Sequence, residues 1–497
     1  TVVVAMGSGF STLDPGYVYE KYPPMIVNAC YETLFKFYSN DGAPEPCLAD
    51  TYEFSEDGLT LTVTLKDGIT FASGNPMTSA DVAFSINRCK NLQGNPAFIA
   101  DTIDSIETPD EKTIVFHLNQ QDSAILSKLT YSSLSVLDSA VVKENGGTDA
   151  EDAATTDTAQ SYLDTTSAGS GMYVMTSYTP DEEVVLEKNP NYWGKATNVD
   201  KYIIKIQPDS NTQMMTLSSG DIDVAMNMTD DTMEELQGAD GIEIINGATK
   251  TVGFVMMNMN ETYSGPMANP KVQQAVRKAL DYTGIQTICG EGTLTPYDII
   301  QVGFMGSKGE RAADYTNVEE AKALLAEAGY PDGFYLRIDA RNDSDVNADQ
   351  VSQAIASYLE KVGIKAEVNL LPRASFYEKT SAENLQSSFF MSGWGDGSGE
   401  GMVIFNDMLY TYDGKPGMGE GNRGHYSNAE VDALLDQASV EPDQAKRAAL
   451  VEQVDQIARD EAAYIPLFFK ENIFGVRAGI QYTPSADDHI LAWDFTF

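Results

Sequence analysis

The sequence predicts a mixed α/β protein built from two lobes. Its 497 residues are too many for one hydrophobic core, because chains longer than about 250–300 residues split into domains. The first half is patterned mainly as β-strands, whereas helical and strand patterns alternate after about residue 250, as in an α/β lobe. Hydrophobic residues make up 42% and charged residues 21% of the chain, so its composition is that of a folded globular protein.

Strand patterns dominate the first half. Over residues 59–65, apolar side chains alternate with threonines, which is the period-two pattern of a half-buried strand. Further strands are predicted at 184–186 and 202–206. Residues 146–160 are acidic, rich in threonine and alanine, and without periodicity, so they predict a surface loop.

Capping residues mark the predicted helix starts. Ser79 is a candidate N-cap, Asn269 precedes a proline at the first helical position, and Ser427–Glu430 has the form of a capping box. Apolar stripes at helical spacing follow these starts and predict two further helices, which end at Gly329 and Gly363. Short strands are expected at 365–370 and 465–469.

The charge of the chain is strongly negative, with 74 acidic against 32 basic residues and a net charge of −42. Such a chain is not expected to bind nucleic acid or an anionic membrane through charge. The total does not prove a cationic ligand, because at physiological salt charges are screened over about 8 Å. No run of 18 apolar residues occurs, so we expect no membrane-spanning helix.

Cysteines and histidines give no sign of a metal site. Cys30, Cys47, Cys89 and Cys289 form no CxxC pair and have no zinc spacing, and both a Cys30–Cys89 disulfide and four free thiols remain open. The three histidines are scattered. His117 lies in an alternating strand on the face away from Ile114, Phe116 and Leu118, where an ordinary surface position is expected.

A series of short segments in a fixed order carries a family resemblance. The segments are Thr12–Pro15, Tyr31–Leu34, Leu59–Gly68, Met77–Val82, Asn189–Trp193, Asn269–Asp281, Ser392–Trp394 and Tyr426–Asn428. Together they resemble the extracytoplasmic solute-binding proteins of ABC importers, specifically the large peptide- and nickel-binding family (family 5), from about residue 2 to about residue 495.

The resemblance implies a bilobal, periplasmic-binding-protein-like fold (type II, cluster C) in which two α/β lobes are joined by a two-strand hinge. Lobe I is expected at 1–48, 168–250 and 471–497, with an inserted subdomain at 49–167, and lobe II at 251–470. The two hinge crossings are expected near residues 248–256 and 468–475.

The function implied is that of the substrate-binding component of an ABC importer. Such a protein captures a small solute, here most simply a short peptide, in an interlobe cleft and delivers it unchanged to the membrane permease subunits. Binding of an oligosaccharide, a nickel chelate or haem by the same fold is the alternative, and a secreted hydrolase using Asp396 and Glu400 as a carboxylate pair is a remote one. No cofactor is expected.

The resemblance also implies an extracytoplasmic protein that acts as a monomer. The chain starts directly with the strand-like residues 1–5, so we expect a mature form whose leader has been removed, either lipid-anchored at the cell surface or free in the periplasm.

The main candidate site is the glycine-rich, acidic turn after Trp394. In peptide-binding relatives this turn carries an acid that pairs with the α-ammonium of the peptide, and the sequence leaves open whether Asp396 or Glu400 has that role. Glycines let a ligand approach the backbone, and the tryptophan offers a stacking face. The predicted contacts in this turn are Trp394, Gly395, Asp396, Ser398 and Glu400.

The remaining candidates come from other segments. Ser8, Gly9 and Phe10 follow the first strand, at an edge where relatives pair with the backbone of an extended ligand. Arg341 or Arg373 could hold a ligand carboxylate, although neither matches the position of the arginine in dipeptide-binding relatives. Tyr131 and Asn258 complete the predicted set. A glycine-rich stretch at 413–424 lacks the pattern of a phosphate-binding loop.

Overall fold

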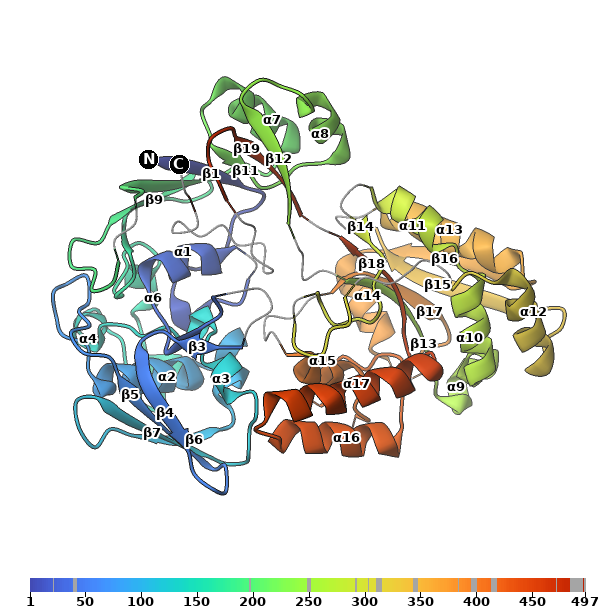
Figure 1. Cartoon of the computed structure of the whole chain (residues 1–497), viewed down its shortest axis with the longest axis horizontal. Coiled ribbons are helices and arrows are strands. Elements are labelled where there is room, and N and C mark those ends of the chain that lie inside the picture. Colours follow the sequence, from blue (N-terminus) through green and yellow to red (C-terminus); the bar gives the residue numbers. More distant parts are fainter. Residues whose placement is uncertain are drawn as a thin grey trace. The chain divides into compact units, whose positions relative to one another are not determined.

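The structure is a computed structural model, and the chain forms two compact units in it (Figure 1). Thr1–Gly247 and Asn472–Phe497 form the first unit, here called lobe I, and Ala248–Glu471 form the second, lobe II. The structure describes residues 1–20, 22–38, 43–195, 198–247, 252–290, 293–302, 304–309, 315–342, 347–382, 384–394, 400–412, 418–470, 472–482 and 495.

Lobe I is built on a seven-stranded sheet with the order β12-β19-β11-β1-β10-β9-β8. β1 runs parallel to its neighbours β10 and β11, and the other pairings are antiparallel. β19 pairs with β12 along its length, so the last described strand of the chain belongs to this lobe. The strands are β1 (Val2–Met6), β8 (Tyr173–Thr179), β9 (Glu183–Lys188), β10 (Lys201–Ile206), β11 (Val224–Ala225), β12 (Ile242–Gly247) and β19 (Asn472–Arg477).

A separate four-stranded antiparallel sheet with its own core lies in the same lobe, in the order β4-β5-β7-β6. In β5, Leu61, Val63 and Leu65 are buried and the threonines between them are partly exposed, which confirms the predicted alternation. In β7, His117 faces Glu107, 3.3 Å away. The strands are β4 (Ala49–Phe54), β5 (Thr60–Leu65), β6 (Ile103–Glu107) and β7 (Thr113–Leu118).

Helix α2 (Ser79–Leu92) covers this core, and it begins with Thr78 rather than Ser79 as its N-cap. The backbone amide of Thr78 donates to Asp81 Oδ2 over 2.8 Å, which completes a capping box. Ser79 instead donates its hydroxyl to the carbonyl of Asp110. The prediction was wrong by one residue because two neighbouring hydroxyl residues compete for the cap and only tertiary contacts separate them.

The acidic stretch 146–160 is not a plain surface loop as expected. It contains α5 (Ala153–Thr156), and Asp157 lies 2.7 Å from Arg88 with both side chains buried. Arg88 also donates through both terminal nitrogens to Asp14, at 2.7 Å each. The prediction of a plain exposed loop was wrong here, because partners far apart in the sequence bury Asp157 and leave no trace in the local pattern.

The remaining elements of lobe I are short, and its cysteines are unpaired. Cys30, Cys47 and Cys89 are buried free thiols, and Cys289 of lobe II is buried as well. The elements are η1 (Pro15–Tyr17), α1 (Pro23–Cys30), β2 (Phe35–Lys36), β3 (Glu45–Pro46), η2 (Asn95–Ala100), α3 (Ile125–Lys128), η3 (Ser132–Leu134), α4 (Ser139–Glu144), α6 (Gln160–Leu163), α7 (Ser210–Ser219) and α8 (Asp230–Leu236).

Lobe II contains a six-stranded mixed sheet with the order β14-β18-β13-β17-β15-β16. β13 runs antiparallel to β18 and β17, while β17, β15 and β16 run parallel to one another. The strands are β13 (Val252–Met257), β14 (Thr293–Leu294), β15 (Tyr335–Arg341), β16 (Lys365–Leu371), β17 (Ser388–Trp394) and β18 (Ile465–Lys470).

The side chains of β13 and β17 alternate between the two faces of this sheet. Val255, Met257 and Phe390 enter a core with α10 (Pro270–Ala279), α11 (Tyr282–Cys289), α12 (Val318–Glu327) and α13 (Ala348–Glu360). The alternate side chains line a cavity with α14 (Arg373–Thr380) and α15 (Gly401–Met408). The other helices of the lobe are α9 (Glu261–Ser264), η4 (Gly265–Ala268), α16 (Ala429–Val440) and α17 (Gln444–Asp460).

Two of the predicted helix starts in lobe II can be compared with the structure. Asn269 caps α10 by accepting from the amide of Lys271 over 3.0 Å, as predicted. At α16 the cap is Asn428, whose side chain accepts from the amides of Glu430 and Val431, and not Ser427. The capping box expected there was therefore placed one residue too early.

Candidate functional site

The predicted ligand-binding turn follows β17, an inner strand of the lobe II sheet. β17 lies between β13 and β15, and its last residue, Trp394, is in register with Val252. The next predicted contacts, Gly395, Asp396 and Ser398, lie outside the described residues. Arg373, which the sequence offers as a contact for a ligand carboxylate, is the first residue of α14.

Glu400, the last predicted acid of this turn, is committed to a contact inside lobe II. Its side chain is buried, and its two carboxylate oxygens accept from Nη2 and Nε of Arg447 over 3.1 and 3.3 Å. Arg447 also donates to the carbonyl of Glu441. A carboxylate held in this way has little capacity left for the ammonium group of a ligand.

Other predicted contacts of lobe II have local partners. Asn258 is fully buried, donates to the carbonyl of Leu385 over 2.7 Å and accepts from the amide of Asn260 over 2.8 Å. Arg341 is the last residue of β15 and is in register with Leu371. Asn258 therefore braces the end of β13, a role that its polarity alone did not reveal.

The candidates of lobe I lie in two places. Ser8, Gly9 and Phe10 follow β1, and the ring of Phe10 stacks on Tyr178 with centroids 5.4 Å apart. Tyr131 precedes η3 and packs against the core of the four-stranded sheet. Within this lobe the structure thus brings Ser8, Gly9 and Phe10 together, and Tyr131 belongs to another part of it.

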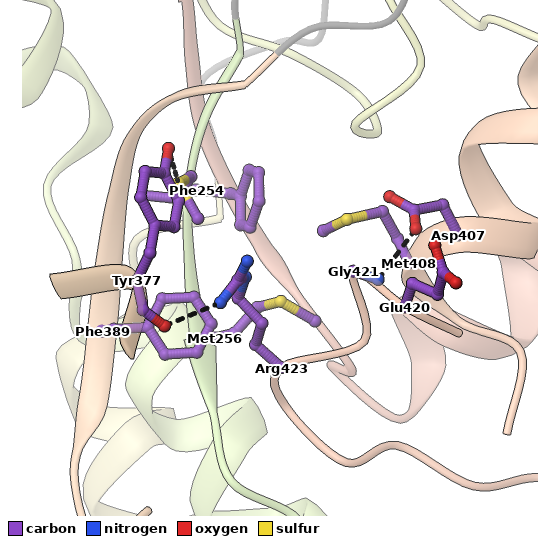
Figure 2. Close-up of a pocket in the computed structure, with 10 residues that line it drawn as sticks. Phe254, Met256, Tyr377, Phe389, Asp407, Met408, Glu420, Gly421 and Arg423 are labelled. Atoms are coloured by element: carbon purple, nitrogen blue, oxygen red, sulfur yellow. Dashed lines mark hydrogen bonds between the residues drawn. The ribbon is translucent and has the colours of Figure 1, made fainter. Parts of the chain in front are cut away.

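A cavity of about 230 Å³ opens within lobe II on the face of the sheet opposite the α10–α13 core (Figure 2). Its walls come from β13, β17, α14, α15 and the segment Glu420–Arg423. The lining residues are Phe254, Met256, Tyr377, Phe389, Met391, Asp407, Met408, Glu420, Gly421 and Arg423. We call it the methionine pocket.

Arg423 supplies the positive charge of the methionine pocket. Its guanidinium lies 5.0 Å from the centroid of the Tyr377 ring, and its Nη1 donates to the carbonyl of Tyr377 over 3.1 Å. Figure 2 shows this group on one side of the pocket and Asp407 and Glu420 on the other. Asp407 accepts from the amide of Gly421 over 2.8 Å.

Sequence reasoning missed Arg423 as a site residue. The position stands in the sequence Asn422-Arg423-Gly424, just before a segment used for the family resemblance. An arginine in a glycine-rich stretch is usually solvent-exposed, and only the fold shows that this one is packed on an aromatic ring. Of two nearby aromatic residues, Phe376 is fully buried and Tyr412 is 62% exposed.

The described part of the chain shows neither a metal-binding cluster nor a membrane-spanning helix. Among these residues, no group of three or more histidine, cysteine, aspartate or glutamate side chains is placed to hold a metal ion. None of the described helices combines the length and apolar character needed to cross a bilayer.

Comparison with known proteins decides the family. The sequence profile of the bacterial extracellular solute-binding proteins, family 5 (middle region), matches residues 43–416 of this chain. The chain belongs to this family. Its members are binding proteins, so the receptor described here is a solute-binding protein and not an enzyme.

Individual relatives cover nearly the whole receptor. It is 26% identical to the probable D,D-dipeptide-binding periplasmic protein DdpA of Escherichia coli, over 94% of this chain and 88% of that one. It is also 26% identical to the haem-binding protein A of Haemophilus influenzae, over 88% and 81% of the two chains. The structure of HbpA2 from Haemophilus parasuis superposes with a TM-score of 0.87 at 22% identity and covers 100% of this chain and 99% of its own, which shows that the fold is shared.

Membership of family 5 establishes the general function of the receptor. The receptor is an extracytoplasmic solute-binding protein of the periplasmic-binding-protein-like fold, and it binds a small ligand and works with the permease subunits of an ABC transporter.

Proposed function

We propose that this receptor captures short peptides in a cleft between lobes I and II and delivers them to its permease. The two chain crossings, at Gly247–Ala248 and Glu471–Asn472, would act as the hinge. Ligand contacts to both lobes stabilise the closed state, since a ligand shifts a conformational equilibrium only by its differential affinity for the two states.

One observation carries the peptide assignment. β17 is an inner strand that leads through Trp394 into an acidic glycine-rich turn, as in peptide-binding relatives. Since Glu400 is buried against Arg447, Asp396 is the remaining predicted acid for the α-ammonium of the peptide. The relationship to a protein named as dipeptide-binding supports the same ligand class.

The test starts with mass spectrometry of small molecules released from the purified receptor by denaturation, followed by calorimetry with trialanine and N-acetyl-trialanine. We expect short peptides to be released and N-acetylation to weaken binding by about 10- to 100-fold, the worth of one charge-assisted hydrogen bond. Asp396→Asn should weaken trialanine binding to a similar extent and remove most of the effect of acetylation.

Asp349→Asn is the matched control, because Asp349 lies in the first turn of α13 and not in the predicted site. Release of haem or a metal chelate with no measurable peptide affinity would contradict the peptide assignment, and would leave the family function intact. That alternative has its own basis in the similarity to a haem-binding protein.

We further propose that the receptor acts as a monomer and is either lipid-anchored or free outside the cytoplasm. Light scattering coupled to size exclusion should give a mass close to 54.0 kDa for this chain. A stable dimer at micromolar concentration would contradict the first part.

A further inference from the structure

The methionine pocket has two charged sides separated by soft apolar walls. Arg423 stands on one side and Asp407 and Glu420 on the other (Figure 2). Three methionines lie among the residues between them, together with Phe254 and Phe389. Methionine side chains are unbranched and polarizable and adapt to apolar groups of different shapes, so such walls suit a variable side chain.

Arg423 has hydrogen-bonding capacity that the protein does not use. Its three contacts, to the carbonyl of Tyr377 and to the hydroxyls of Thr380 and Ser381, are all made by Nη1. Within the described residues, Nε and Nη2 have no acceptor, and no carboxylate lies within ion-pair distance. These two nitrogens form one edge of the guanidinium fork, which matches the two oxygens of a carboxylate.

Arg423 is partly buried, and the buried arginines of the described chain are in a different situation. Arg88, Arg447 and Arg459 each lie against a carboxylate, at 2.7, 3.1 and 2.9 Å. Burial lowers the pKa of Arg423, and the charges of Tyr377 and Asp407 offset this only in part, whereas the carboxylates beside Arg88 and Arg459 raise the pKa of those two groups despite burial. A partly desolvated cation without a carboxylate in direct contact is costly, and an anionic ligand would offset that cost.

The volume limits what can enter. An apolar cavity of about 150 Å³ holds benzene, whereas a complete drug-sized ligand occupies roughly 300 Å³ or more. At about 230 Å³ the methionine pocket has room for one amino-acid residue with a medium or large side chain. It is too small for a tripeptide or a porphyrin.

We propose that the methionine pocket binds one apolar amino-acid residue that carries a free carboxylate, with Arg423 holding the carboxylate and the methionines and phenylalanines taking the side chain. The acids on the opposite side disfavour an acidic side chain there. This inference rests on the proposed function, and it supplies the carboxylate-binding arginine for which Arg341 and Arg373 matched poorly. The residue is either the C-terminal residue of a peptide or a free amino acid.

Calorimetry on the full chain distinguishes binding of a peptide's C-terminal residue from binding of a free amino acid. The probes are Ala-Leu, its C-terminal amide, Ala-Glu and free leucine, each titrated into the wild type, Arg423→Met and Arg423→Lys. Lys361→Met is the matched control, since Lys361 also lies over a tyrosine ring, that of Tyr358 at 4.9 Å, but outside the pocket. Thermal unfolding of each variant verifies that it is folded.

We expect wild type and Lys361→Met to bind Ala-Leu about 10- to 100-fold more tightly than its amide and more tightly than Ala-Glu. Arg423→Met should bind acid and amide alike, and Arg423→Lys should keep part of the preference, because an ammonium lacks the planar fork. Binding of free leucine with the same Arg423 dependence identifies the free amino acid as a source, and its absence identifies the peptide.

Two outcomes overturn the inference and differ from each other. If wild type prefers the acid and Arg423→Met keeps the full preference, another group holds the carboxylate, while the proposed peptide function stands. If wild type binds none of the four probes, and trialanine also fails, the peptide function and the inference fall together.

Discussion

The carboxylate of Glu400 lies 3.1 Å from Nη2 of Arg447, and both side chains are almost completely buried in lobe II. Glu400 is the N-cap residue of α15, and Arg447 lies on α17. The pair thus links the start of α15 to α17. Glu400, which the sequence offered as a ligand contact, is thus paired with an arginine inside lobe II.

Removal of one member of this pair should destabilise the receptor strongly. Glu400→Ala leaves Arg447 buried without its anion, and we expect a loss of about 3–5 kcal/mol in the free energy of unfolding. Urea denaturation measures it, with Glu327→Ala as the control because Glu327 forms an exposed pair with Lys271. Equal urea midpoints for the two variants would show that the buried pair is not important for stability.

The peptide affinity of a folded Glu400→Gln variant should change far less than the peptide affinity of Asp396→Asn.

The pairing of Asp157 with Arg88 predicts a pH-dependent contribution to the stability of lobe I. Burial alone would raise the pKa of Asp157, but its hydrogen bond and charge interaction with Arg88 lower the pKa below the ordinary value of 3.8. The unfolded chain therefore binds more protons, and the stabilisation is complete above about pH 4 and is lost as the pH falls through the folded pKa. Asp157→Asn should destabilise the protein at pH 6, and its difference from wild type should shrink toward pH 3. A difference that stays constant over this range in urea titrations would contradict the assignment.

Asp298 predicts a pH effect of the opposite sign in lobe II. Burial and then the charge of Asp455 raise the pKa of this carboxyl to about 8, and it accepts from the amides of Ile300 and Lys308 at 2.8 and 3.2 Å. The folded state binds the extra proton between about pH 4 and 8, so the stability contributed by this group falls as the pH rises, by up to about 1.4 kcal/mol per pH unit. Asp298→Asn cannot titrate and should show a flatter dependence of the urea midpoint from pH 5 to 8. Parallel curves for wild type and variant would refute the raised pKa.

Two glycines of lobe II form a matched pair for substitution. Gly329 and Gly333 both have positive φ, at 91° and 73°, but a Cβ on Gly329 would meet open space and one on Gly333 would collide with the carbonyl of Gly363. Gly329→Ala should cost about 1 kcal/mol for the left-handed backbone alone. Gly333→Ala should cost clearly more, because backbone atoms at the Gly363 turn must move. Equal melting temperatures for the two variants would contradict this, because they would show that the backbone at Gly363 moves at little energetic cost.

The parts of the fold that were predictable from sequence have short-range causes. The alternation of Leu61, Val63 and Leu65 determines which face of β5 is buried, because successive side chains of a strand point to opposite sides. The asparagine–proline pair at Asn269 determines the start of α10, because both residues act within one turn. The order of the short segments along the chain was enough to indicate the family, and the profile match confirms it.

The errors arose where several partners were available. Thr78 and Ser79 both suit an N-cap, and so do Ser427 and Asn428, so the choice depends on what else each side chain contacts. Asp157 looked like a solvated acid because Arg88, its partner, is 69 residues away. Acid content and spacing also do not show that Glu400 pairs with Arg447, which is 47 residues away.

By itself, the sequence determined the solute-binding family, the mixed α/β character and several helices and strands, because these follow from local periodicity, capping and the order of segments. Only the tertiary structure decided which charged groups are already paired. It assigned Glu400 to Arg447, buried Asp157 against Arg88 and placed Arg423 on the ring of Tyr377, with no carboxylate of the described residues at ion-pair distance. The physical reason is that the interaction and desolvation of a charge depend on distances in space, and these distances join residues far apart in the chain.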